Sequence, residues 1–209
     1  MKKNAKQKIL EAAMDVFGEQ GFRAATVREI CKKAGVNIAL VNYHFKSKKL
    51  LYYELFNAIS ADIDGRYPLE KFVSPDMTKE EKLKGLVLML VSRFFGPDGL
   101  SSSKSRLKLV NREMQEPTDV MEETILQKMA EFKTAGEDIF HDFLGKDVPA
   151  EKTNMLIISI VGQCAYPMFS TELLRKAGII SLPMNEFCRE LAEHVYDFSL
   201  RALENMRSK

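Results

Sequence analysis

Four short side chains that suit contact with DNA bases lie close together in the sequence: Asn37, Ile38, Ala39 and Asn42. An asparagine side chain can pair with adenine through two hydrogen bonds, and small apolar groups can touch the methyl group of thymine. Asn42 therefore suits an adenine, whereas Ile38 and Ala39 suit a thymine. Arg28, further upstream, can reach a guanine or a phosphate. Side chains of these types at the start of one helix predict readout in a major groove.

The local sequence predicts two short helices that would position these side chains. Thr26 can cap the first helix, and Glu29 can reach back to the Thr26 amide to form a capping box. Gly35 suits the left-handed residue that ends this helix. Asn37 can cap the second helix, which runs to His44. Two short helices joined by a tight turn with glycine are typical of a helix-turn-helix, whose second helix enters the major groove.

Two lysines begin the next helix, where the helix dipole disfavours cations. Ser47 can cap this helix, and Lys48 and Lys49 occupy its first turn. A phosphate bound there would offset the penalty, because the amides at the helix start and the lysine charge would act together. The alternative is an exposed lysine pair with no ligand.

This region also carries a family signature. The letters AGV at 34–36 and YHF at 43–45, followed by Ser47-Lys48 and Leu51, resemble the DNA-binding signature of TetR-family transcriptional regulators. The resemblance covers about residues 5–55. It implies a homodimer that binds operator DNA, with phosphates held by Tyr43, His44 and Lys48.

The chain departs from the family at one anchor, because many members carry tyrosine where this chain has Asn42. For His44 two readings stay open, a phosphate contact and a hydrogen bond that packs the helix, whereas Phe45 is expected in the core. The predicted DNA-binding set is Thr26, Arg28, Asn37, Ile38, Ala39, Asn42, Tyr43, His44 and Lys48.

The charge distribution favours the same end of the chain for a polyanion. Residues 1–50 hold eleven basic and four acidic residues, a balance of +7, whereas the whole chain has a net charge of +2. The remainder therefore carries −5. A basic end beside an acidic body predicts that nucleic acid meets the N-terminal part. The alternative for Lys2, Lys3, Lys6 and Lys8 is a solvated face.

The periodicity of apolar residues predicts an all-α fold of about nine helices and no sheet. We expect a helix-turn-helix DNA-binding domain over 1–47 and a helical effector-binding and dimerisation domain over 48–209. The long helices of the body are predicted at 79–95, 104–115, 118–144, 151–176 and 185–206, with Thr118 capping the third of these.

The body resembles a subgroup of the family. The segment 111–118 and the letters NIALVNYHF resemble CecR-type regulators, which implies repression of membrane transport and drug-sensitivity genes. An adaptable apolar pocket is expected between the helices at 79–95, 104–115, 118–144 and 151–176. The alternative is that the residues named for it only fill the core, or that Arg112 and Glu113 form an ion pair. The predicted ligand-binding set is Met89, Phe94, Phe95, Arg112, Met114, Gln115, Met121, Gln163, Cys164, Tyr166 and Met168.

Together with the resemblance, these features predict a transcriptional regulator of the repressor type that leaves operator DNA when a small apolar or amphipathic effector enters the body. The alternative is a DNA-binding protein without an effector, regulated by a partner or by concentration. A homodimer is expected through the last two long helices, on the apolar seam Phe187, Leu191, Val195 and Phe198.

Other classes of protein are poorly supported by the sequence. The three histidines and three cysteines lack metal-site spacing, and no GxSxG, Walker or GxGxxG motif is present. We therefore expect no enzyme, no cofactor and no metal. An odd cysteine count fits a reducing compartment. With no signal peptide and only short apolar runs, the chain is expected in the cytoplasm without a membrane contact.

Overall fold

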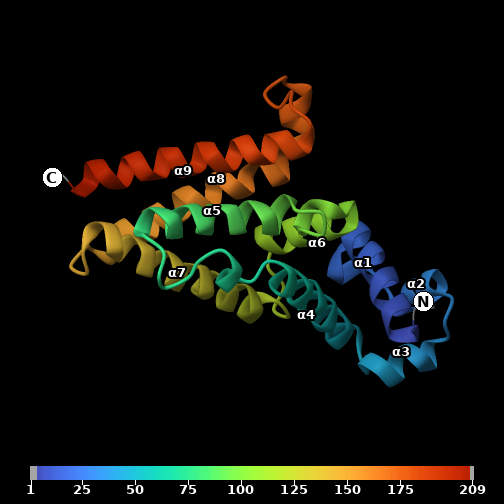
Figure 1. The fold of residues 1–209 in the computed structure, drawn as a ribbon. Coiled ribbons are helices and arrows are strands. Elements are labelled where there is room, and N and C mark those ends of the chain that lie inside the picture. Colours follow the sequence, from blue (N-terminus) through green and yellow to red (C-terminus); the bar gives the residue numbers. More distant parts are fainter. Residues whose placement is uncertain (1–3, 208–209) are drawn as a thin grey trace. The chain divides into compact units, whose positions relative to one another are not determined.

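The computed structural model describes residues 4–207, and over this range the chain is helical without a strand (Figure 1), as the sequence predicts. Two short 3-10 turns, Leu69–Lys71 and Leu100–Ser102, interrupt the connections. The helices are α1 (Ala5–Ala24), α2 (Val27–Ala34), α3 (Ile38–Phe45), α4 (Lys48–Arg66), α5 (Lys79–Phe95), α6 (Lys104–Gln115), α7 (Glu122–Leu144), α8 (Ala150–Lys176) and α9 (Met184–Arg207).

The predicted caps of the helix-turn-helix are present. The Thr26 hydroxyl accepts a hydrogen bond from the Glu29 amide, and the Glu29 carboxylate accepts one from the Thr26 amide, so the capping box is complete. Gly35 ends α2 with a φ of 66°, in the left-handed region that favours glycine. The Asn37 side chain caps α3 through the Leu40 amide at 2.9 Å. These local predictions are confirmed.

The described residues form two compact units. The first unit runs to Ile63 and includes Leu100–Ile125, and the second comprises Asp64–Gly99 and the described residues from Leu126 onward. α6 therefore belongs to the same compact unit as the helix-turn-helix. The predicted boundary at residue 47 separates a DNA-binding part from an effector-binding and dimerisation part, and it stays a prediction.

An aromatic cluster holds the first unit together. The ring of Tyr52 on α4 lies edge-on against Phe17 on α1 at 4.7 Å between centroids, and against Phe56 at 5.2 Å. α6 packs closely on α1, since a Cβ on Gly18 would lie 2.6 Å from the Ser105 carbonyl oxygen. The Ser105 hydroxyl also donates to the Asp15 carboxylate at 2.7 Å.

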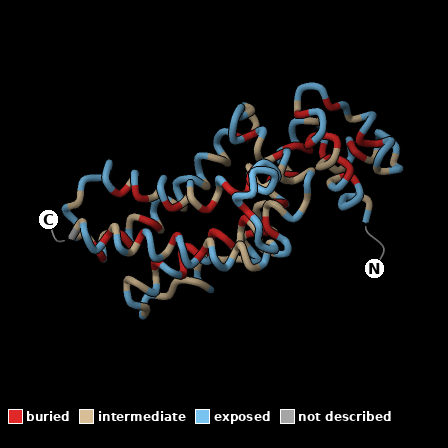
Figure 2. Tube along the Cα trace, turned by 90° about the horizontal axis from the view of Figure 1, so that it is seen from above, coloured by how far each residue is buried: buried red, intermediate tan, exposed pale blue. Residues whose placement is uncertain are grey.

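The second unit is built around α5, which packs against α8 and α9. Its side chains Leu83, Val87 and Leu90 are buried almost completely, as the apolar sequence of this helix predicts. Buried and exposed residues alternate along the helices, as expected for amphipathic helices (Figure 2).

Two predictions about the body are wrong in detail. α7 begins at Glu122 rather than beside Thr118, because the Thr118 amide and hydroxyl both bind the Glu113 carboxylate. The predicted seam on the last helix is also divided, because Val195 faces inward while Phe187 and Leu191 are half-buried. Val195 is fully buried within the chain and Phe187 packs edge-on against Phe95, so of the apolar residues proposed for that seam only Phe198 is exposed.

Candidate nucleic-acid interface and body cavity

α3 has one face packed on the core of the first unit and one face open. Val41 and Phe45 are each 2% exposed, so Phe45 is a core residue as predicted. On the other side Ile38 is 47% exposed and Tyr43 80%. A helix repeats about every 3.6 residues, so the exposed Asn42 lies on the same open face. The open face of α3 therefore combines exposed apolar and polar side chains.

The cap of α3 limits what Asn37 can contribute. Its side-chain oxygen accepts the hydrogen bond from the Leu40 amide, so it is already engaged at the helix N-terminus. The residue is exposed, and this hydrogen bond does not use the donors of its side-chain amide nitrogen. Ala39 is exposed next to it. The structure thus brings all four predicted base-contacting residues to one exposed helix start.

Thr26 and Arg28 lie at the start of α2 and are both exposed. The Thr26 hydroxyl donates to the Glu29 carboxylate at 2.7 Å and accepts from the Glu29 amide, so it serves the capping box. Hydrogen bonds from the Thr26 hydroxyl and amide, together with one from Gln20, hold the pKa of Glu29 below its ordinary value. Arg28 is an exposed cation in the first turn of α2.

Lys48 has structural partners that the sequence did not indicate. Its ammonium group donates to the carbonyl oxygens of Arg23 at 3.2 Å and Ala25 at 2.9 Å, and it lies 4.8 Å from the centre of the Phe22 ring. These carbonyls end α1, so Lys48 ties the start of α4 to the end of α1. Two of the three ammonium donors are thereby used, and the phosphate contact stays a prediction for the third.

His44 is half-buried at the end of α3, and its ring lies edge-on to Tyr43 with 5.1 Å between centroids. Tyr43 itself projects into solvent. The two readings of His44 as phosphate contact or packing residue both remain open, because its ring touches a neighbour on the open face and a second neighbour, Phe45, in the core.

The predicted ligand-binding residues are divided between the two units. Arg112, Met114, Gln115 and Met121 belong to the first unit and the other seven to the second. In the second unit Met89, Cys164 and Met168 are almost fully buried, Phe94 is 8% exposed and Tyr166 is 59% exposed. Burial raises the pKa of the Cys164 thiol to about 12, so it is a neutral core group. Phe95 is half-buried beside Phe187, and the Gln163 amide donates to the Ser159 carbonyl at 3.1 Å.

The first-unit members of this set include core and surface residues. Met121 is 1% exposed, whereas Met114 is 46% exposed and Gln115 donates to Asn111 on the same helix at 3.0 Å. The Arg112 guanidinium lies against Gly21, where a Cβ would approach it to 2.5 Å. The suggested Arg112–Glu113 ion pair would compete with other contacts of the carboxylate, because Glu113 is buried and accepts hydrogen bonds from Tyr52 and Thr118.

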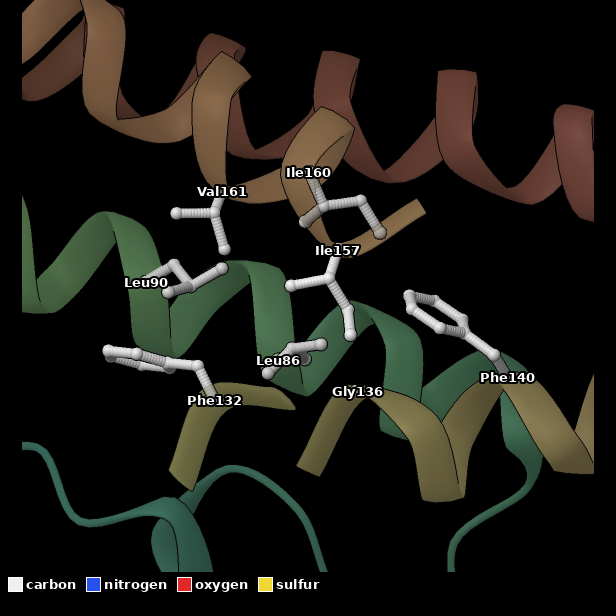
Figure 3. A pocket seen from close by; sticks show the side chains of 8 residues that line it. All are labelled: Leu86, Leu90, Phe132, Gly136, Phe140, Ile157, Ile160 and Val161. Carbon is white, nitrogen blue, oxygen red and sulfur yellow. The ribbon is translucent and has the colours of Figure 1, made fainter. Parts of the chain in front are cut away.

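A small apolar cavity lies within the second unit, between α5, α7 and α8 (Figure 3). Its volume is about 10 Å³, which is room for about one water molecule. Because its walls are almost entirely hydrocarbon, such a space stays dry. Its lining residues are Leu86, Leu90, Phe132, Gly136, Phe140, Ile157, Ile160 and Val161.

None of the residues predicted to bind a ligand lines this cavity. The residues that line the cavity could not be predicted from the sequence, because their spacing is the same as that of other apolar residues in buried helices. One local signal was present in Gly136, which interrupts the apolar steps along α7. A Cβ there would lie 2.9 Å from Cγ1 of Ile157, so the glycine lets α8 approach α7 closely.

No group of three or more histidine, cysteine or acidic side chains within residues 4–207 is placed to hold a metal ion. Among the described helices, α8 is long and apolar enough to cross a membrane by length and composition, and 28% of its apolar stretch is buried. Core helices of soluble proteins share this length and composition, so this is weak support for a membrane span.

Two family models match the chain. Residues 9–55 match the family described as bacterial regulatory proteins, tetR family, and residues 79–203 match the C-terminal domain of the HTH-type transcriptional dual regulator CecR. The two matched segments contain the helix-turn-helix and most of the body, respectively.

Individual relatives agree with this assignment. The uncharacterized HTH-type transcriptional regulator TtgW of Pseudomonas putida is 31% identical over 102 residues, which are 49% of this chain and 72% of TtgW. The HTH-type transcriptional regulator SrpR of Pseudomonas putida is 28% identical over 139 residues, and the match spans 63% of this chain and 62% of SrpR, less than two thirds of that relative. These relatives are transcriptional regulators rather than enzymes.

The fold is shared with solved structures. The crystal structure of the transcriptional regulator FadR from Bacillus subtilis in complex with stearoyl-CoA aligns with a TM-score of 0.64 at 16% identity, over 91% of this chain and 97% of FadR. At this identity the likeness concerns the fold alone. The helical fold of this chain is therefore the same as that of a known transcriptional regulator.

Proposed function

Because this chain belongs to the TetR family of bacterial transcriptional regulators, we propose that it is a repressor that binds palindromic operator DNA as a homodimer and leaves it when an effector enters the body. The observation that carries the DNA-binding part is the open face of α3. Asn42, Ile38 and Ala39 are exposed on this face, while Val41 and Phe45 fix the helix to its support. Such a helix can enter a major groove without rearrangement.

The proposed DNA contacts divide into readers and anchors. Asn42, Ile38 and Ala39 read base edges, with Asn37 and Arg28 at the margin of the same surface. Tyr43, His44 and Lys48 hold phosphates, and Thr26 keeps the start of α2 in place. The basic balance of the N-terminal end supports this division, because phosphate contacts supply most of the sequence-independent affinity.

An exposed apolar face on α8 supports the homodimer. Met155 is 62% exposed, Ile158 61%, Tyr166 59% and Leu173 68%, and their spacing by threes, fours and multiples of these puts them near one stripe of the helix. Phe198 on α9 is 57% exposed as well. A second copy of this chain that covers the stripe would bury it by two-fold symmetry. The same stripe accounts for the apolar character of α8 in a cytoplasmic protein.

An apolar or amphipathic effector is supported by the hydrocarbon walls between α5, α7 and α8. FadR, with its stearoyl-CoA, is an example of a protein of this fold that holds a long apolar chain attached to a polar group. The cavity of about 10 Å³ is far smaller than such a molecule, so binding has to open the helices. That opening is the physical link to DNA release, since a ligand shifts an equilibrium only by its different affinity for the two states.

The experiment first selects duplexes from a random pool with the wild-type chain and then measures the affinity for the enriched duplex with and without stearoyl-CoA and palmitate. A fall in affinity with one probe, matched by an equal fall in probe affinity when the duplex is present, supports the repressor with an effector. Duplex binding that neither probe changes, although one of them binds the body, favours the alternative, a DNA-binding protein regulated by a partner or by concentration.

A further inference from the structure

Arg93 on α5 connects three segments of the second unit. Its guanidinium lies 3.2 Å from the carboxylate of Asp64, in the last turns of α4, and its Nε donates to the Tyr67 carbonyl at 2.9 Å. The same group lies over the ring of Phe132 on α7, 5.5 Å from the ring centre. The Arg93 side chain is only 12% exposed. A largely buried arginine with these three partners holds them in one arrangement.

Phe132 is also a wall of the cavity. Figure 3 shows its side chain on α7 near those of Leu90 and Leu86 on α5, and all three line the same space. Leu86 and Leu90 are buried, whereas Phe132 is half-buried. Because the space holds about 10 Å³, any organic occupant has to displace part of the wall. The Phe132 ring is therefore the wall that joins the cavity to Arg93.

Asp64 lies at the other end of this chain of contacts. It also accepts a hydrogen bond from Lys128 on α7 at 2.8 Å, so two cations from different helices fix the final turns of α4. α4 begins at Lys48, directly after the turn that follows α3. A change at Asp64 thus acts on the same continuous helix whose first residue ties α4 to the end of α1.

We propose that Arg93 is the positioning residue that makes operator affinity depend on the state of the cavity. An occupant turns the Phe132 ring, the guanidinium loses the ring face, and its grip on Asp64 and the Tyr67 carbonyl is released. The empty cavity keeps all three contacts and fixes the end of α4. This inference rests on the proposed function, because it describes how the effector site and the DNA-binding helices are coupled.

The test mimics the occupied state by substitution and needs no effector. Phe132→Leu keeps an apolar wall but removes the ring, and Arg93→Met keeps the length of the side chain but removes the charge. We expect each variant to bind the selected duplex at least fivefold more weakly than wild type, which lies in the usual range of allosteric coupling. The double variant is expected to be no weaker than the stronger single one, because both changes break the same chain of contacts.

A matched control is available at the same end of α4. Arg66 pairs with Asp98 at 2.8 Å, but both side chains are about half exposed. Arg66→Met removes a cation from the same region without touching Phe132 and is expected to change duplex affinity less than twofold. Arg93→Lys keeps the charge beside Asp64 but loses the planar guanidinium, so an intermediate loss of duplex affinity is expected. This variant replaces Arg93→Met in the comparison if Arg93→Met does not fold.

The outcomes separate this inference from the proposed function. Folded Arg93 variants with wild-type affinity for the duplex, losses that multiply in the double variant, or an equal loss in Arg66→Met would each overturn the role of Arg93. If stearoyl-CoA lowered the duplex affinity of wild type and of Arg93→Met by the same factor, the role of Arg93 would also be overturned, but the proposed repressor function would stand. A wild-type chain that enriches no duplex would instead remove the proposed function itself.

Discussion

The hydroxyl of Tyr52 on α4 donates a hydrogen bond to the buried carboxylate of Glu113 on α6, with 2.5 Å between the oxygens. The second carboxylate oxygen accepts from the Thr118 amide at 2.9 Å. Burial, followed by the hydrogen bond to Glu113, raises the pKa of Tyr52 far above its ordinary value, so the hydroxyl stays a donor. One carboxylate therefore joins α4, α6 and the turn before α7 within the first unit.

Replacing this carboxylate should destabilise the protein. Glu113→Ala leaves the Tyr52 hydroxyl and the Thr118 amide without their acceptor, which should lower the free energy of unfolding by about 2–5 kcal/mol. Glu113→Gln keeps one acceptor oxygen and should cost less. Urea unfolding followed by circular dichroism measures both. Glu116→Ala, on an exposed neighbour, is the control, and equal stability of all three variants would contradict the role of Glu113.

A second prediction concerns pH and the cap of α2. Because the pKa of Glu29 is lowered in the folded protein, its contribution to stability is present above the unfolded pKa and is lost as the pH falls through the folded value. A carboxyl titration by NMR should give a pKa below the ordinary value. Thr26→Val removes the hydroxyl but keeps the backbone amide, so the pKa of Glu29 should rise part of the way. An unchanged titration in Thr26→Val would show that the hydroxyl does not bind the carboxylate in solution.

Contacts between residues close together in the sequence could be predicted, whereas contacts that depend on distant residues could not. Thr26, Glu29, Gly35 and Asn37 were predicted correctly because a cap involves residues three or four apart. Thr118 was predicted to cap the helix 118–144, but its amide and hydroxyl donate to Glu113, whose carboxylate also accepts from Tyr52, 61 residues away in the chain. Local spacing carries no information about such a contact.

The body shows the same limit. The apolar repeat on α9 was visible, but periodicity does not say whether Val195 faces its own chain or another one. Likewise, nothing in the spacing distinguished the cavity walls Leu86 and Ile160 from ordinary core residues. The open face of α3 could be predicted from the sequence, because it follows from the two inward residues Val41 and Phe45; the DNA contacts of that face stay a prediction.

The third prediction separates readers from anchors on the DNA-binding surface. Asn42→Ala should relax sequence preference, whereas Tyr43→Phe and Lys48→Ala should weaken binding to all sequences and reduce the dependence on salt. A library of duplex variants at two salt concentrations measures both effects. If Asn42→Ala and Lys48→Ala behaved alike across the library, the division would be wrong.

Lys48 carries an additional expectation from its structural partners. Lys48→Ala frees the carbonyls at the end of α1, so it should lower the free energy of unfolding by about 1 kcal/mol. Lys49→Ala, on the exposed neighbour, should change stability by less than about 0.5 kcal/mol. Thermal unfolding of the two variants side by side provides the comparison, and equal melting points would argue against the tie between α4 and α1.

The fourth prediction concerns the homodimer. Ile158→Asp places a charge on the exposed stripe of α8 and should weaken self-association at least tenfold, because an unpaired charge would be buried against the second copy. Met129→Asp, on an exposed methionine of α7, is the matched control and should leave association unchanged. Sedimentation at micromolar concentration measures both. A wild-type chain that sediments as a monomer there would contradict the dimer.

Selection of DNA from a random pool tests the central claim most directly. With the wild-type chain we expect an inverted repeat whose half-site centres are about one helical turn, roughly 34–36 Å, apart. Asn42→Ala should enrich a broader set of half-sites at the same spacing. Enrichment of no sequence, or of single sites without an inverted repeat, would contradict a dimeric regulator that reads DNA with α3.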